Sequence, residues 1–170
     1  DGKYDTRVVF AEGLETANTV LPWRDGALVV APPIIWFMRD QSGDGIADEK
    51  RILYEGFGRG NEQHRVNGLV WGLDGWIYVG NGDSGGTIRS KITGKQLALG
   101  GSDLRIRPDT GELERATGRT QHGRNRDDWG NWVAGNNSNA WQIILEDNYI
   151  RKNTLVSQPN SRNTITGVID

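Results

Sequence analysis

The chain contains no cysteine, only five prolines and one methionine among its 170 residues. The absence of cysteine excludes disulfide bonds, thiolate metal sites, cysteine nucleophiles and covalent attachment of a c-type haem. No apolar run approaches the ~20 residues that a membrane-spanning helix requires, so we expect no transmembrane segment. The net charge of −2 gives no general positive field, and we expect no binding to nucleic acid.

Helical periodicity is also scarce. The best helical candidate is the short segment Asn148–Thr154. Elsewhere, short runs of β-branched and aromatic residues alternate with turn pairs such as Asp-Gly, and seven Trp supply large side chains for a core. We therefore expect an all-β fold. The expected strands are Arg7–Phe10, Ala27–Ala31, Ile34–Met38, Arg51–Tyr54, Leu69–Trp71, Trp76–Val79, Leu104–Arg107 and Trp141–Leu145.

One pattern occurs three times, in Leu21–Pro33, Leu69–Asp83 and Arg126–Asn137. Each copy has a turn pair, then an alternating apolar run, then a small or polar patch. The turn pairs of successive copies lie 49 and 55 residues apart. A period of that size, built from strands and hairpins, is typical of the blades of a β-propeller.

We expect a partial β-propeller over residues 1–156, with blades over residues 4–39, 51–83 and 87–137 and a fourth beginning at residue 141. Propellers close with about four to eight blades. Either the polypeptide is longer, which we favour, or partner chains cover the open edges. Since the chain starts at Asp1 without a signal-like region, we expect a mature product or a fragment. Residues 157–170 are expected to be a linker or the first strand of the next blade.

The acidic loop Asp40–Asp48 has oxygen-bearing side chains at its first, third, fifth and ninth positions and Gly at the sixth. Calcium prefers six to eight oxygen ligands, and glycine permits the sharp turn that gathers them. Arg51 stands where an EF-hand has Glu, so a shorter calcium loop is indicated. The alternative is a hairpin that uses Asp and Gly only for turning. The expected calcium ligands are Asp40, Ser42, Asp44, Asp48 and the backbone carbonyl of Ile46.

His64 and Asp83 flank the middle copy of the repeat. The strand after His64 leads to a turn, and the returning strand leads back to Asp83, so we expect the two side chains to lie close together. A carboxylate beside a neutral histidine orients the ring and stabilises the imidazolium, which suits a general base. The alternative is that His64 is a structural residue, hydrogen-bonded in a loop.

The phrase H-x-x-x-G-L-V-W-G-L-D-G-W-I-Y-V-G-N-G-D-S-G-G, which starts at His64, resembles the active-site blade of soluble quinoprotein glucose and sorbosone dehydrogenases. The resemblance implies a six-bladed propeller that uses pyrroloquinoline quinone and calcium. It also implies that His64 takes the proton of the substrate hydroxyl, with Asp83 beside it.

A closer resemblance, over nearly the whole chain, is to the membrane-bound dehydrogenases of planctomycetes and verrucomicrobia. It includes the phrases DGALVVAPP, SGDGIADEKRILYEGF and HGRNRDDWGNWVAGNNSN. Those exported propeller proteins often have a C-terminal haem-binding CxxCH domain. Because no CxxCH occurs here, haem is expected only on an absent domain or on another chain.

A second polar cluster, Gln121–Asp128, precedes the third copy of the repeat. In the glucose enzymes the comparable stretch, G-H-R-N-P-Q-G, touches the quinone, and here Thr120 and His122 replace its Asn and Gln. The resemblance implies quinone contacts by Arg65, Thr120, His122, Arg124 and Asn137. The alternative is a solvated network of Arg/Asp salt bridges. For Trp71, Trp76, Trp129, Trp132 and Trp141, packing between blades is favoured over a carbohydrate platform.

The leading hypothesis is a periplasmic or extracellular quinoprotein-like dehydrogenase that oxidises a sugar or an alcohol and passes electrons to a cytochrome. The first alternative is a non-catalytic propeller that binds a polysaccharide or a protein partner. The second is a calcium-dependent hydrolase or lactonase, which requires carboxylates from several blades around one metal ion.

Overall fold

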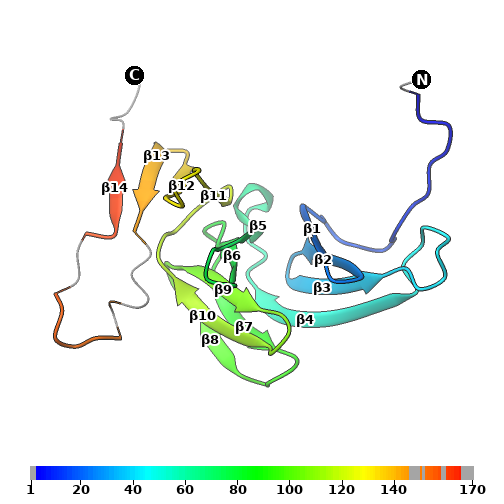
Figure 1. Cartoon of the computed structure of the whole chain (residues 1–170), viewed down its shortest axis with the longest axis horizontal. Coiled ribbons are helices and arrows are strands. Elements are labelled where there is room, and N and C mark those ends of the chain that lie inside the picture. Colours follow the sequence, from blue (N-terminus) through cyan, green and yellow to red (C-terminus); the bar gives the residue numbers. More distant parts are fainter. Residues whose placement is uncertain (1–2, 146–149, 151, 158–159, 166–170) are drawn as a thin grey trace.

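The computed structural model describes residues 3–145, 150, 152–157 and 160–165. The regular secondary structure of this part of the chain is almost entirely β-strand, in three antiparallel sheets (Figure 1). The expected all-β class is therefore confirmed. Among the described residues no helix is long and apolar enough to cross a membrane.

The first sheet has six strands in the order β1-β2-β3-β4-β7-β8. Its strands are β1 (Thr19–Trp23), β2 (Gly26–Ala31), β3 (Ile34–Arg39), β4 (Glu49–Phe57), β7 (Gly86–Ser90) and β8 (Gln96–Ala98). A two-residue turn joins β1 to β2, with Arg24 at φ 53°. Gly26 is required for another reason: a Cβ atom there would overlap the carbonyl oxygen of Met38.

The second sheet has the order β10-β9-β6-β5. Its strands are β5 (Asn67–Trp71), β6 (Ile77–Gly80), β9 (Asp103–Arg107) and β10 (Glu112–Ala116). The hairpin β7–β8 lies between β6 and β9 in sequence, but it leaves this sheet and pairs with β4 of the first. The chain thus crosses from the second sheet to the first and back between β6 and β9.

The third sheet has the order β11-β12-β13-β14. Its strands are β11 (Arg124–Arg126), β12 (Trp132–Asn136), β13 (Asn139–Ile144) and β14 (Arg162–Thr164). β14 falls in the tail that we expected to be a linker or the start of a next blade, and here it pairs with β13.

The sheets divide the strands differently from the ranges expected for blades. The segment Arg51–Tyr54, expected to open the second blade, lies in β4 and completes the first sheet. The expected strand Arg7–Phe10 is wrong, because this segment forms no strand and its side chains are exposed. The helical candidate Asn148–Thr154 lies partly outside the described residues.

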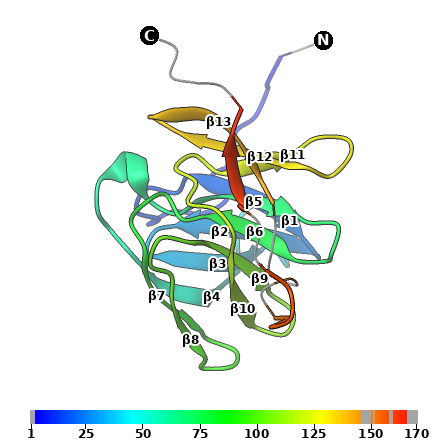
Figure 2. The ribbon, with the colours of Figure 1, turned by 90° about the vertical axis from the view of Figure 1, so that its left-hand side faces the viewer.

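Alternation along the strands places two apolar layers between the sheets. In β6, Ile77 and Val79 face the layer shared with the first sheet, whereas Tyr78 faces the third sheet. The second layer contains Trp76, Tyr78, Ala116, Trp132, Ala134 and Ile144. Trp76 and Trp132 thus pack between sheets, while Trp71, Trp129 and Trp141 are 39%, 85% and 55% exposed. Figure 2 shows the sheets one behind another.

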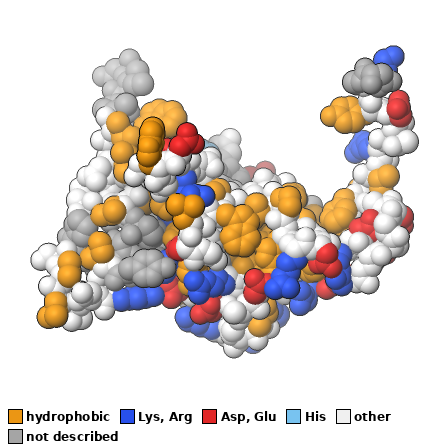
Figure 3. Space-filling view, viewed as in Figure 1, with side chains coloured by type: hydrophobic (Ala, Val, Ile, Leu, Met, Phe, Trp, Pro, Cys, Tyr) orange, Lys and Arg blue, Asp and Glu red, His pale blue; other side chains and the backbone are white. Residues whose placement is uncertain are grey.

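The outer faces of the first and third sheets differ. On the first, Ala11 and Leu14 of the N-terminal segment pack against a cluster that contains Val29 and Met38. On the third, the outward-facing residues Trp141 and Ile143 are exposed. The space-filling view shows hydrophobic side chains on the side of the third sheet and in the hollow between the raised ends of the molecule (Figure 3).

The role of Gly26 gives a prediction about stability. Gly26→Ala should destabilise the protein by about 3 kcal/mol, because the new methyl group meets a backbone carbonyl that cannot turn away. Gly94→Ala is the control, since Gly94 has φ +73° and open space around it, and should cost only about 1 kcal/mol. Urea unfolding measures both, and equal losses would contradict the overlap at Gly26.

Candidate functional site

The middle copy of the repeat brings His64 and Asp83 together. His64 ends the short 3₁₀ helix η1 (Glu62–His64), while Asp83 follows β6 with φ 69°. Gly82 allows this approach, because a Cβ atom there would overlap the carbonyl group of Arg65. As a result, His64 Nδ1 lies 3.6 Å from Asp83 Oδ2, and the two side chains are 29% and 25% exposed.

The carboxylate of Asp83 has a second partner on its other oxygen. Arg119 Nε donates to Asp83 Oδ1 at 2.8 Å. The hydroxyl of Ser84 donates to the carbonyl oxygen of His64, which ties the loop after β6 to η1. Asp83 therefore lies between a guanidinium group and an imidazole ring, in a loop that is fixed at both ends.

Gln121 contacts the other nitrogen of the ring. Its Nε2 atom lies 2.9 Å from His64 Nε2, and its Oε1 atom accepts from the backbone N–H of Asn137 at 3.0 Å. Because a backbone N–H can only donate, the amide oxygen of Gln121 must face Asn137 and its NH₂ group must face His64. The NH₂ group then donates to His64 Nε2.

This hydrogen bond selects one tautomer of His64. A donor at Nε2 requires a lone pair there, so the neutral ring has its proton on Nδ1. Nδ1 is the nitrogen that faces Asp83. The ring is thus oriented from both sides, and a substrate hydroxyl that donates to Nε2 has to take the place of the Gln121 amide.

These side chains open onto a polar cavity of about 450 Å³. It is lined by His64, Asp83, Arg119, Gln121, Asn136, Asn137, Ser138, Asn139 and Arg162. Amide, hydroxyl and guanidinium groups dominate this lining. Such groups hydrogen-bond to ligands with several hydroxyls or with an anionic group.

A buried carboxylate holds the two segments of the site together. Asp103 is fully buried at the start of β9. Its Oδ1 atom accepts from the backbone N–H of Asn81 and of Thr120, each at 3.0 Å, and from the Thr120 hydroxyl at 3.2 Å. Asn81 is two residues before Asp83, and Thr120 immediately precedes Gln121, so Asp103 fixes both segments.

The surroundings of Asp103 make its charge costly. Burial raises the pKa of its carboxyl to about 6, and the nearby guanidinium of Arg124 and the hydrogen bonds from Thr120 and Asn81 only partly oppose this. Arg124 Nη1 lies 3.7 Å from Asp103 Oδ2. No described residue gives that oxygen a hydrogen bond.

The residues expected to hold the quinone do not form one set. Asn137 lines the cavity beside His64. Arg65 is buried and donates to Thr16 Oγ1 at 2.8 Å, and the Thr120 hydroxyl is used by Asp103. Arg124 is stacked between the rings of Tyr78 and Trp132, 4.3 and 4.4 Å from their centroids.

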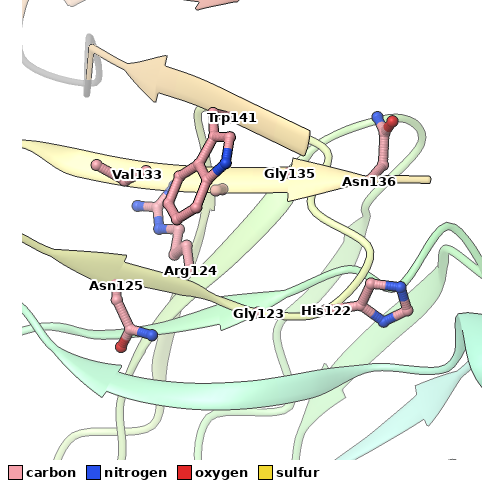
Figure 4. A pocket seen from close by; sticks show the side chains of 9 residues that line it. His122, Gly123, Arg124, Asn125, Val133, Gly135, Asn136 and Trp141 are labelled. Atoms are coloured by element: carbon pink, nitrogen blue, oxygen red, sulfur yellow. The ribbon is translucent and has the colours of Figure 1, made fainter. Parts of the chain in front are cut away.

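His122 points to a different part of the surface. It lines a pocket of about 290 Å³ on the outer face of the third sheet, with Asn125, Val133 and Trp141 (Figure 4). In Figure 4, His122 and Asn136 lie at one side of that pocket and Asn125 and Val133 at the other, and Arg124 also lines it. The pocket is linked to the His64 cavity by Asn136, which lines both, and by a 3.4 Å contact between His122 Nε2 and Asn137 Oδ1. The five residues therefore do not all line one cavity, although Arg65 and His122 line another one together, and their quinone contacts stay a prediction.

In the acidic loop, the carboxylates turn towards backbone amides. Asp40 accepts from the N–H groups of Gly43 and Gly45, both at 2.7 Å, and hydrogen bonds from the amides of Gly45 and Gly43 lower the pKa of its carboxyl. Asp48 Oδ2 accepts from the amides of Gln41 and Ser42. Asp44 Oδ1 accepts from the amide of Ile46, two residues on, as in an Asx turn, whereas the bonds of Asp40 and Asp48 close longer parts of the loop.

No three His, Asp or Glu side chains of the described residues gather as a metal-binding group. The side chains of this loop, as they lie here, therefore do not form a converging calcium site. Calcium at Asp40, Ser42, Asp44, Ile46 and Asp48 stays a prediction, and no step in the chemistry below depends on it.

Arg119, Gln121 and Arg162 line the site but were not among the residues predicted to form it, although Gln121 stood in the second polar cluster. Arg119 and Gln121 are the neighbours of Thr120, which was assigned to the ligand instead. Side chains on extended backbone alternate between two sides, so neighbours in such a segment face different surroundings. Polar residues at 119–122 give no hydrophobic pattern that shows which of them faces the cavity.

A comparison with protein families shows the family of this chain. The family model described as Domain of unknown function (DUF7133) matches residues 1–169. The chain belongs to the DUF7133 family. No curated protein and no solved structure matched this DUF7133 domain.

Asp103 makes the stability of the DUF7133 domain depend on pH. Its pKa is raised to about 6 from 3.8, so its contribution is greatest below about pH 4 and is lost as the pH rises through 6. The stability advantage of the wild type over Asp103→Asn should therefore fall by about 3 kcal/mol between pH 4 and pH 7.

Urea unfolding at both pH values checks this expectation. Asp127→Asn is the control, because hydrogen bonds from Asn131 lower the pKa of the Asp127 carboxyl. Its contribution is lost as the pH falls, so the difference from wild type changes with the opposite sign. A pH-independent difference for Asp103→Asn would contradict the burial of an ionisable carboxyl.

The tautomer of His64 can be observed directly, because the chain has only two histidines. In ¹⁵N NMR spectra, the neutral ring of His64 should bear its proton on Nδ1. The variant His122→Asn shows which signals belong to His64, because it removes those of the other histidine. Gln121→Glu places an acceptor at Nε2, so the proton should move there. A wild-type His64 protonated on Nε2 would show that the Gln121 amide does not face the ring in this way.

Proposed function

We propose that this DUF7133 domain is part of an exported, quinoprotein-like β-propeller that oxidises a sugar or an alcohol, with His64 as the general base. The observation on which this rests is the placement of His64 Nδ1, 3.6 Å from Asp83 Oδ2, at the mouth of a polar cavity. Asp83 is itself held by Arg119. A histidine oriented by a carboxylate is suited to take a proton at neutral pH.

The architecture supports the propeller part of the proposal. Three four-strand meanders follow one another in chain order, β1–β4, then β5, β6, β9 and β10, then β11–β14. Apolar layers join the successive sheets face to face. We propose that further sheets continue this arrangement, as in a six-bladed propeller.

In the proposed reaction, the substrate hydroxyl replaces the Gln121 amide at His64 Nε2 and donates its hydrogen bond there. The hydroxyl proton passes to Nε2 as a hydride leaves the carbon, so the hydroxyl becomes a carbonyl group. Asp83 stabilises the imidazolium through Nδ1–H. Pyrroloquinoline quinone, when bound as the resemblance implies, would supply the acceptor for this hydride, and a cytochrome would then take the electrons, in the periplasm or outside the cell.

A second candidate function is the binding of a saccharide without catalysis. It is favoured by the hydrogen bond from Gln121, which already occupies the basic nitrogen of His64. In this case, His64 is one polar group among the amides that line the cavity.

Dye reduction over a panel of sugars and alcohols tests the proposal, with the protein reconstituted with pyrroloquinoline quinone and Ca²⁺. His64→Asn should lower kcat by roughly 10²- to 10⁴-fold, because the base is lost. Gln96→Asn is the control, since Gln96 is an exposed polar residue on β8 that does not line this cavity, and it should retain wild-type activity.

Full activity of His64→Asn in an otherwise active protein would remove His64 from the chemistry. Saccharide binding in the cavity without oxidation of any compound would favour the second candidate.

A further inference from the structure

The charges around the cavity leave one positive charge unbalanced. Arg119 and Arg162 are the two cations of its lining, and Asp83 is the one carboxylate. Arg119 and Asp83 form an ion pair. With a neutral His64, the lining of the cavity therefore has a net charge of +1.

The excess charge lies on Arg162. It is exposed on β14, and no described residue accepts a hydrogen bond from its side chain or forms an ion pair with it. The terminal nitrogens of Arg119 are also available as donors, because Asp83 accepts only from its Nε atom. An arginine with both terminal nitrogens available binds a carboxylate through two parallel hydrogen bonds.

The rest of the lining suits hydroxyl groups. The turn between β12 and β13, with the strand residue on each side of it, contributes Asn136, Asn137, Ser138 and Asn139. Asn136 Oδ1 accepts from the backbone of Ser138 and Asn139 at 2.9 and 2.8 Å, which fixes the loop. The neighbouring amides both donate and accept, as recognition of several sugar hydroxyls requires.

We propose that the cavity binds an anionic monosaccharide of the uronic acid class, with its carboxylate on Arg162 and a hydroxyl at His64 Nε2. The single unbalanced positive charge matches a carboxylate better than a doubly charged phosphate, of which one charge would stay uncompensated. This inference rests on the proposed function only in placing the reacting hydroxyl at His64, because the binding of the carboxylate requires no reaction.

Isothermal titration calorimetry at low salt tests the inference, with D-glucuronate, D-glucose and D-glucose 6-phosphate as probes for the whole chain. D-Glucuronate should bind more tightly than the other two. Arg162→Gln should weaken D-glucuronate binding about three- to tenfold, a modest loss because the arginine is exposed, and leave D-glucose binding unchanged. Arg162→Lys, which keeps the charge but loses the paired donors, should fall between.

Arg7→Gln is the matched control, since Arg7 is exposed on the N-terminal segment and its loss changes the net charge by the same amount. Equal binding of D-glucuronate and D-glucose, or unchanged D-glucuronate binding in Arg162→Gln, would overturn the inference and leave the proposed function standing. Tighter binding of D-glucose 6-phosphate would overturn the assignment to a carboxylate. If none of the three binds, saccharide recognition at His64 fails as well.

Discussion

Two segments of the chain meet at the candidate site, and both are attached to the carboxylate of Asp103. One segment runs from Asn81 to Asp83, and the other from Thr120 to Gln121. A carboxylate with no access to water is costly to ionise, and here three hydrogen bonds and a guanidinium group only partly offset that cost. That guanidinium, of Arg124, lies between two aromatic rings of the layer that joins the second and third sheets. The distance between His64 and Asp83 thus depends on how these two sheets pack.

Both ring nitrogens of His64 already face a side chain of the protein. Asp83 lies beside Nδ1, and Gln121 donates to Nε2. A ligand that uses Nε2 has to offer a better hydrogen bond than an amide already in position, and the displaced amide stays tied to Asn137. Such a site discriminates against weak or poorly aligned ligands, because each of them leaves the Gln121 amide in place.

Much of the fold could be predicted because turn signals and alternation are local. Strands next to the turns Asp25-Gly26, Asp74-Gly75 and Asp109-Thr110-Gly111 appeared close to where they were expected, as β2, β6 and β9. Pairing between distant strands is not local, which is why the assignment of β7 and β8 to the first sheet was missed. Arg7–Phe10 has the composition of a strand but forms none, and the carbonyl of Phe10 accepts instead from the amide of Ala47, at 2.8 Å.

The residues of the candidate site could likewise be predicted only where the sequence signal was local. His64 and Asp83 flank a hairpin, so their approach followed from a simple out-and-back path. The choice among Arg119, Thr120, Gln121 and His122 depended on which side of an extended segment faces the cavity. All four are polar, so their sequence gives no hydrophobic pattern from which to decide. Arg124 is a charged residue that the structure buries, because aromatic faces and a buried carboxylate surround it.

The hairpin β7–β8 has a consequence for how the molecule opens. It begins three residues after Asp83 and ends five residues before Asp103, yet its hydrogen bonds are to the first sheet. Neither of the first two sheets can separate from the other without either breaking those bonds or stretching the connections on both sides of the hairpin. The amide hydrogens of β4 and β6 consequently belong to one unit that opens cooperatively. The loop of Asp83 is connected to this unit at both ends, through β6 on one side and β7 on the other.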